Sequence, residues 1–125
     1  MRSVLLYWVP IALYSGLVLF LSLMPDSGGP SYGWDKANHF IAYAVMSFLF
    51  MRAASGDRPS IRTAITAVLV VSLFGIGVEF LQSLTSTRKA EALDALANGL
   101  GAAVGVGGFA FFSLIKNRAE VKRCL

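Results

Sequence analysis

The sequence contains long apolar runs with almost no charge, and these runs restrict the possible folds of the chain more than any other feature does. They cover about residues 4–24, 36–53, 63–84 and 93–115. A helix needs about 20 apolar residues to cross the hydrocarbon core of a bilayer. Three runs have that length. The second is shorter, and it spans the core because the charged side chains of Lys36 and Arg52 at its ends extend toward the membrane interfaces. We therefore predict an all-α, polytopic membrane protein built as a bundle of four transmembrane helices.

The composition also favours a membrane protein. Apolar residues make up 56% of the chain and charged residues only 14%, which is too little charged surface for a soluble domain of 125 residues. At this length we expect residues 1–125 to form a single transmembrane domain. The net charge of +4 does not indicate nucleic-acid binding, because the basic residues flank apolar runs instead of forming one patch. Membrane lipids are the expected partners, nucleic acid is not, and the oligomeric state stays open.

The first apolar run is expected to remain as a helix rather than to be cleaved as a signal peptide. It is long for the apolar part of a signal peptide, and no small-x-small site precedes Pro25. The only cysteine, Cys124, excludes a disulfide framework and a cysteine-based metal site.

The distribution of basic residues predicts the orientation in the membrane. If the N-terminus is cytoplasmic, eight of the eleven basic residues lie on the cytoplasmic side, and the other side holds three. Cytoplasmic loops are enriched in lysine and arginine. Both termini are therefore expected in the cytoplasm. The three on the outer side are Lys36, Arg88 and Lys89.

Polar side chains gather at the outer end of this predicted bundle. The second helix carries them at i, i+4 and i+8 in its first turns, the third carries them near its end, and the fourth carries an i, i+4 pair at its start. Such spacings place side chains on one helical face. The candidate ligand-binding residues are Asp35, Lys36, His39, Tyr43, Glu79, Gln82, Arg88, Asp94 and Asn98.

Glu79 is the most demanding of these residues, because an ionised carboxylate inside a bilayer is costly unless it is paired or protonated. We expect either a cation beside it, supplied by Lys36, Arg88 or a protonated His39, or a raised pKa of the carboxyl group. A structural network that fixes helix packing and a pocket for a polar or anionic ligand are both compatible with this pattern.

The role of His39 is open in the same way. A structural hydrogen bond, ligand binding and proton transfer are all within the chemistry of an imidazole. A site of one imidazole with carboxylates could hold a metal, but the chain lacks the close ligand spacing of known metal motifs, so we expect no metal and no cofactor. Whether the chain is an enzyme stays open, with His39 and Glu79 as the candidate catalytic residues.

Three elements at the polar end resemble the VanZ-like family. Residues 35–43 resemble its DKxxHFxxY element, residues 79–82 its ExxQ element, and Arg88 with residues 94–101 its R…DxxxNxxG element. The resemblance covers about residues 35–105 and implies a small multi-pass protein of the bacterial cytoplasmic (inner) membrane. The family takes its name from an accessory protein of glycopeptide resistance, associated with teicoplanin, and many members lie outside any resistance setting.

The leading functional hypothesis is an outer-leaflet pocket that recognises a lipid headgroup, a lipid-linked envelope precursor or a lipophilic glycopeptide. Lys36 and Arg88 would supply positive charge, and Gln82 and Asn98 would supply hydrogen bonds. One alternative is a membrane-embedded enzyme on a lipid-linked substrate, with His39 and Glu79 as acid and base. The other is a structural protein whose polar cluster only locks the bundle.

Overall fold

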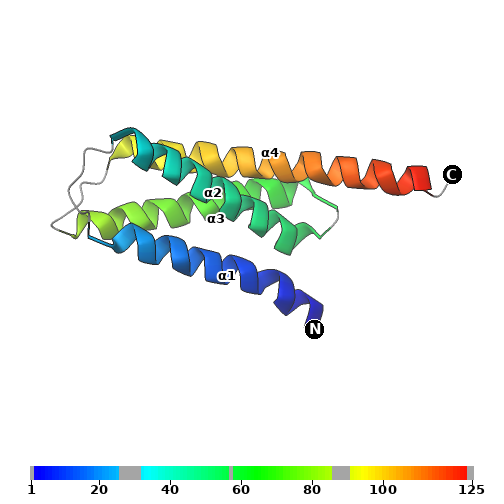
Figure 1. The fold of residues 1–125 in the computed structure, drawn as a ribbon, viewed down its shortest axis with the longest axis horizontal. Helices are drawn as coiled ribbons and strands as arrows, with labels where there is room; N and C mark the ends of the chain where they lie inside the picture. The colour runs from blue at the N-terminus through cyan, green and yellow to red at the C-terminus, as the bar shows by residue number, and fades with distance from the viewer. Residues whose placement is uncertain (1, 26–31, 57, 86–90, 124–125) are drawn as a thin grey trace.

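The computed structural model is all-helical, and its four helices run up and down beside one another (Figure 1). They are α1 (Arg2–Leu23), α2 (Tyr32–Ser55), α3 (Ile61–Ser83) and α4 (Ala92–Arg123). The structure describes residues 2–25, 32–56, 58–85 and 91–123, with side chains from Val4 onward in α1 and from Lys36 onward in α2. The predicted all-α architecture with four helices is confirmed.

Local sequence signals fix the turn between α2 and α3. Gly56 follows the last residue of α2 and has a φ of +56°, the left-handed conformation that ends helices and that glycine adopts without strain. Ser60 precedes α3, and its Oγ accepts a hydrogen bond of 3.1 Å from the backbone N–H of Thr63. This N-cap satisfies a donor that the first helical turn leaves unpaired.

The fourth helix is longer than its apolar run. We expected it to end near residue 115, where the apolar side chains stop, but α4 continues to Arg123 and extends beyond the other helices (Figure 1). The added segment is charged and rich in good helix formers, and Lys122 and Arg123 complement the helix dipole in the last turn. Apolarity predicted the apolar part of this helix but not its polar continuation.

The outer surface of the bundle is apolar. Three helices, α1, α3 and α4, are long and apolar enough to cross a membrane. Leu6, Phe20, Leu73 and Phe111 illustrate the exterior, since each is well over half exposed. A protein surrounded by water rarely exposes so much contiguous apolar surface. The helices and their exterior therefore indicate a membrane protein.

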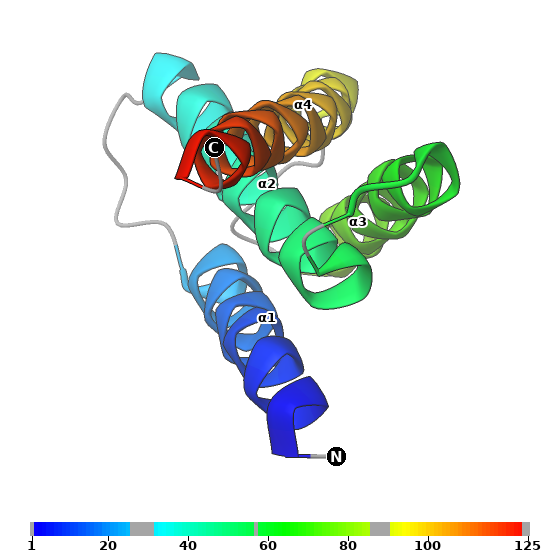
Figure 2. The same cartoon turned by 90° about the vertical axis from the view of Figure 1, so that its right-hand side faces the viewer.

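The second helix lies at the centre of the bundle. It packs against α1, α3 and α4, most extensively against α4 (Figure 2). Gly101 and Gly105 of α4 allow this approach, because a Cβ added at either would overlap the backbone carbonyl of Phe40 or Ala44 in α2. Small residues at this spacing let helix backbones come close in membranes.

Only part of the glycine pattern of α4 serves this contact. At two other glycines of this helix an added Cβ would meet no obstacle, since Gly108 has open space around it and Gly99 would make an ordinary contact with Ser72 at 3.8 Å. A further tie joins the two helices, because the buried Ser47 hydroxyl donates a 2.8 Å hydrogen bond to the carbonyl of Ala102. The contact between α2 and α4 thus depends on Gly101, Gly105 and Ser47.

We call the end of the bundle where α1 and α3 end and α2 and α4 begin the polar end. α1 begins and α4 ends at the opposite end (Figure 1). Buried apolar side chains between the two ends include Tyr43, Met46, Val71 and Ala102 in one cluster, with Met51, Ala67 and Phe109 in a second. This packing holds the polar ends of α2, α3 and α4 at one level.

Candidate functional site

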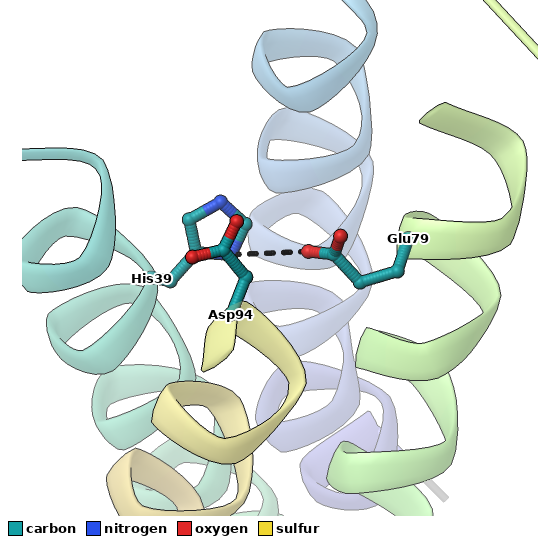
Figure 3. A group of neighbouring side chains, drawn as sticks. All are labelled: His39, Glu79 and Asp94. Atoms are coloured by element: carbon teal, nitrogen blue, oxygen red, sulfur yellow. Dashed lines mark ion pairs between the residues drawn. The ribbon is translucent and has the colours of Figure 1, made fainter. Parts of the chain in front are cut away.

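Three helices contribute a side chain each to the centre of the polar end. His39 from α2, Glu79 from α3 and Asp94 from α4 point toward one another (Figure 3). One ring nitrogen and one oxygen from each carboxylate all lie within 4.8 Å of one another. Glu79 is buried, and His39 and Asp94 are partly buried. These are ligand types that a metal ion accepts, and they are also an acid–base set.

His39 makes its closest contact with α4. Its Nδ1 lies 3.0 Å from Oδ1 of Asn98, a hydrogen-bonding distance, and 3.7 Å from Oε1 of Glu79. Asn98 is 1% exposed and His39 is partly buried, so this hydrogen bond is largely shielded from solvent, which strengthens it. The same ring nitrogen therefore lies within reach of an amide oxygen and of a carboxylate.

Lys36 forms ion pairs with a carboxylate of α4 and with a carboxylate just before this helix. Its Nζ lies 2.9 Å from Oε2 of Glu91 and 3.9 Å from Oδ1 of Asp94. Both contacts are partly exposed, and such ion pairs are worth less than fully buried ones. Of the three cations expected beside Glu79, His39 makes a described contact with it, and Arg88 lies outside the described residues.

Tyr43 and Gly75 form the floor of the site. The ring of Tyr43 lies parallel to that of His39, one helical turn deeper, with an interplanar angle of 4° and centroids 6.3 Å apart. A Cβ added to Gly75 of α3 would lie 2.9 Å from Cε1 of Tyr43 and 2.8 Å from Nδ2 of Asn98. Gly75 therefore makes room for both side chains, one turn below Glu79.

The side chain of Gln82 reaches toward α1. Its side-chain amide donates a 2.8 Å hydrogen bond to the backbone carbonyl of Ser22, which ties α3 to the end of α1. The residue was predicted to hydrogen-bond a ligand, and in this arrangement its amide N–H is used within the protein. The side chain of Asp35 lies outside the described residues, although its backbone belongs to α2.

A hollow of about 410 Å³ lies between α1 and α2 beside the cluster. It is lined by the polar residues Ser22, Asn38 and His39 and by the apolar residues Val18, Leu21 and Ala42, together with Tyr43, whose hydroxyl is buried. His39 thus belongs both to the hollow and to the cluster with Glu79 and Asp94. The hollow is within the size range of sites that hold small molecules.

The sequence pattern located most of this cluster but missed some of its parts. Helical spacing placed His39, Tyr43, Glu79, Asp94 and Asn98 at the polar end, and the structure brings these five together. The sequence pattern gave no sign that Gly75 and Ser22 would line the site or the hollow, and Asn38, although polar and at that end, was not among the candidate residues. A glycine in the middle of an otherwise bulky apolar helix was the available signal for Gly75.

Comparison with protein-family models, with curated proteins and with solved structures finds no match to this chain. The class of protein defined here therefore rests on the fold and the site: an all-helical protein of four helices, three of them fit to cross a membrane, with a buried polar cluster at one end.

Proposed function

We propose that the chain is a VanZ-like protein of the bacterial inner membrane, that all four helices cross the bilayer, and that both termini lie in the cytoplasm. The apolar exterior and the three membrane-fit helices support the membrane setting. At 24 residues α2 is as long as α1 and α3, and it lies among the other helices, so it crosses with them. The excess of basic residues at the end opposite the polar end supports the orientation.

Cysteine labelling in intact cells tests this topology. In a Cys124→Ser background, a cysteine at the exposed Ser83 should react with a membrane-impermeant maleimide from outside. A cysteine at the exposed Arg58 should react only after the cells are permeabilised. Both positions are exposed, so accessibility within the protein is matched. The reverse labelling pattern would reject the orientation and place the polar cluster in the cytoplasm.

The function we propose is recognition of the polar part of an amphiphile at the outer membrane surface. The observation that carries it is the hollow between α1 and α2, which presents hydroxyl, amide and imidazole groups beside an apolar wall. A lipid-like molecule has the same division between headgroup and chain. A lipid headgroup, a lipid-linked envelope precursor and a lipophilic glycopeptide all share this chemistry.

The polar groups that line the hollow suit a headgroup with phosphate, hydroxyl or amide functions. Asn38 is exposed, and His39 lies next to it along the hollow. Lys36 lies one turn from His39 with a side chain 33% exposed, so its charge can act on an anionic headgroup at the rim. An anion there would compete with Glu91 for Lys36.

Filling the hollow provides the test. Ala42→Phe should weaken binding of the recognised amphiphile by about tenfold or more, because the new ring occupies the apolar part of the hollow. Binding is measured on purified protein in nanodiscs with phosphatidylglycerol, an undecaprenyl-linked precursor and teicoplanin as separate probes. Ala103→Phe is the matched control, since it fills a separate apolar hollow between α3 and α4.

Two results would overturn the proposal. One is the absence of saturable binding for all three probes to the wild-type protein. The other is equal binding by wild type, Ala42→Phe and Ala103→Phe to the probe that does bind.

An enzyme on a lipid-linked substrate is the second candidate. It is favoured by the 3.7 Å approach of His39 Nδ1 to Glu79 Oε1 at the edge of the hollow, where an imidazole and a carboxylate can exchange protons with a substrate. Mass analysis of the same probes after incubation separates the two functions. A product that wild type forms and His39→Gln does not would favour the enzyme over recognition alone.

A further inference from the structure

We propose that His39, Glu79 and Asp94 bind a divalent transition-metal ion, with Zn²⁺ or Mn²⁺ as the chemical class. The three residues come from three different helices, so no short sequence motif announces the site. Metal binding here does not depend on the proposed recognition of an amphiphile, and it can be measured without any such ligand.

The distances fit a metal site after small movements. His39 Nδ1 and Asn98 Oδ1 are 3.0 Å apart, which is about the separation of adjacent ligands around an ion with bonds of about 2.1 Å. The three donor atoms of His39, Glu79 and Asp94 lie within 4.8 Å of one another. Adjacent ligands of such an ion are about 3.0–3.4 Å apart, and one opposite pair is about 4.2 Å apart. Side-chain rotations that move the carboxylate oxygens by about 1 Å close the difference. Asn98 Oδ1 is then placed to be a fourth ligand.

The charges favour a cation at this point. Two carboxylates lie close together in an environment of low dielectric, where their repulsion is strong. Lys36 forms described ion pairs with Glu91 and Asp94. A divalent ion between Glu79 and Asp94 would balance both carboxylates at once, and neutral His39 would contribute its lone pair.

The floor of the cluster supplies independent support. The Tyr43 hydroxyl and the Asn98 side-chain nitrogen are buried and make no hydrogen bond within the described part of the chain. Both residues are 1% exposed, and both adjoin Gly75, one turn below Glu79. Buried polar groups almost always have a partner. Water bound to a metal ion above them would provide one for each.

The ligand types decide the class of ion. Imidazole and carboxylate suit Zn²⁺ and Mn²⁺, whereas Cu⁺ prefers sulfur and Ca²⁺ takes six to eight oxygen ligands. Within the described residues the cluster offers one nitrogen, two carboxylates and one amide oxygen. A bound ion would also place a strong positive charge beside the hollow that His39 lines.

Calorimetric titration of Zn²⁺ and, separately, Mn²⁺ into detergent-solubilised protein tests the site. The protein carries Cys124→Ser to remove the only thiol, and a purification tag without histidine. We expect saturable binding of one equivalent per chain for at least one of the two ions. Glu79→Gln and Asp94→Asn should each weaken it by about 100-fold, as expected for loss of a ligand. Glu120→Gln, the same chemical change far along α4, should leave it unchanged.

A spectroscopic measurement on the unsubstituted site keeps the test independent of variant folding. The chain has a single histidine, so ¹⁵N-labelled histidine gives one pair of ring signals, both from His39. Zn²⁺ should shift the Nδ1 signal in a saturable way, and the helical circular dichroism spectrum should not change. The proposal is overturned if neither ion binds saturably, if the His39 signals do not respond to Zn²⁺, or if folded Glu79→Gln and Asp94→Asn bind as tightly as wild type.

Discussion

Gly105→Leu is expected to cost the bundle about 3 kcal/mol or more of stability, the largest effect of any single substitution considered for this protein. A side chain at this position would overlap the carbonyl of Ala44 and the hydroxyl of Ser47 in α2. The obstacle on one side is backbone, which cannot rotate away as a side chain can. α2 and α4 would have to separate, and their contact is the most extensive in the fold.

The measurement is thermal unfolding in mild detergent, followed by circular dichroism. Gly108→Leu is the matched control, because it makes the same change on the same helix at a position with no neighbour within 4 Å of the added Cβ. We expect it to melt within a few degrees of wild type. If both variants melt alike, the close approach of α2 and α4 is not what holds the bundle together.

Gly75→Ala is expected to disturb the polar site more than the fold. The added methyl group would press on Tyr43 and on the amide of Asn98, at 2.9 and 2.8 Å. Tyr43 cannot easily yield, since its ring is parallel to His39 and contacts Phe74 with centroids 6.4 Å apart. The Asn98 amide should therefore move, which weakens its hydrogen bond to His39. We expect a loss of about 1–3 kcal/mol in stability with full helical content.

The direct readout is the ring ¹⁵N spectrum of the single histidine. In Gly75→Ala the His39 signals should shift because the bond to Asn98 changes. Gly77→Ala, two residues further along α3 with open space around its Cβ, should leave both the spectrum and the melting temperature near those of wild type. An unchanged His39 spectrum in a folded Gly75→Ala protein would contradict this account of the site.

The helices themselves could be predicted from the pattern of residues. Apolar runs of suitable length predicted four helices, and the structure has four. The prediction missed the end of α4, because the polar residues after 115 are held by helix propensity and not by burial.

The partners of the charged groups were harder to predict from the sequence. Lys36 was one of three cations expected near Glu79, yet its described ion pairs are with Glu91 and Asp94. Gln82 lies at the polar end with the cluster, yet its amide reaches back to α1. Helical spacing tells which residues share a face of one helix, but it does not tell how far neighbouring helices are rotated toward one another.

Read as a linear chain, the amino acids already determine that four helices form, that lipid suits their exterior and that polar groups collect at one end, because these depend on local composition and periodicity. The choice of partner for each polar group depends on how the helices rotate and approach, and that is decided by glycines packed against a neighbouring backbone. Only after that packing do His39, Glu79 and Asp94 come within 4.8 Å of one another. Residues on separate helices and far apart in the chain become one site through tertiary contact alone.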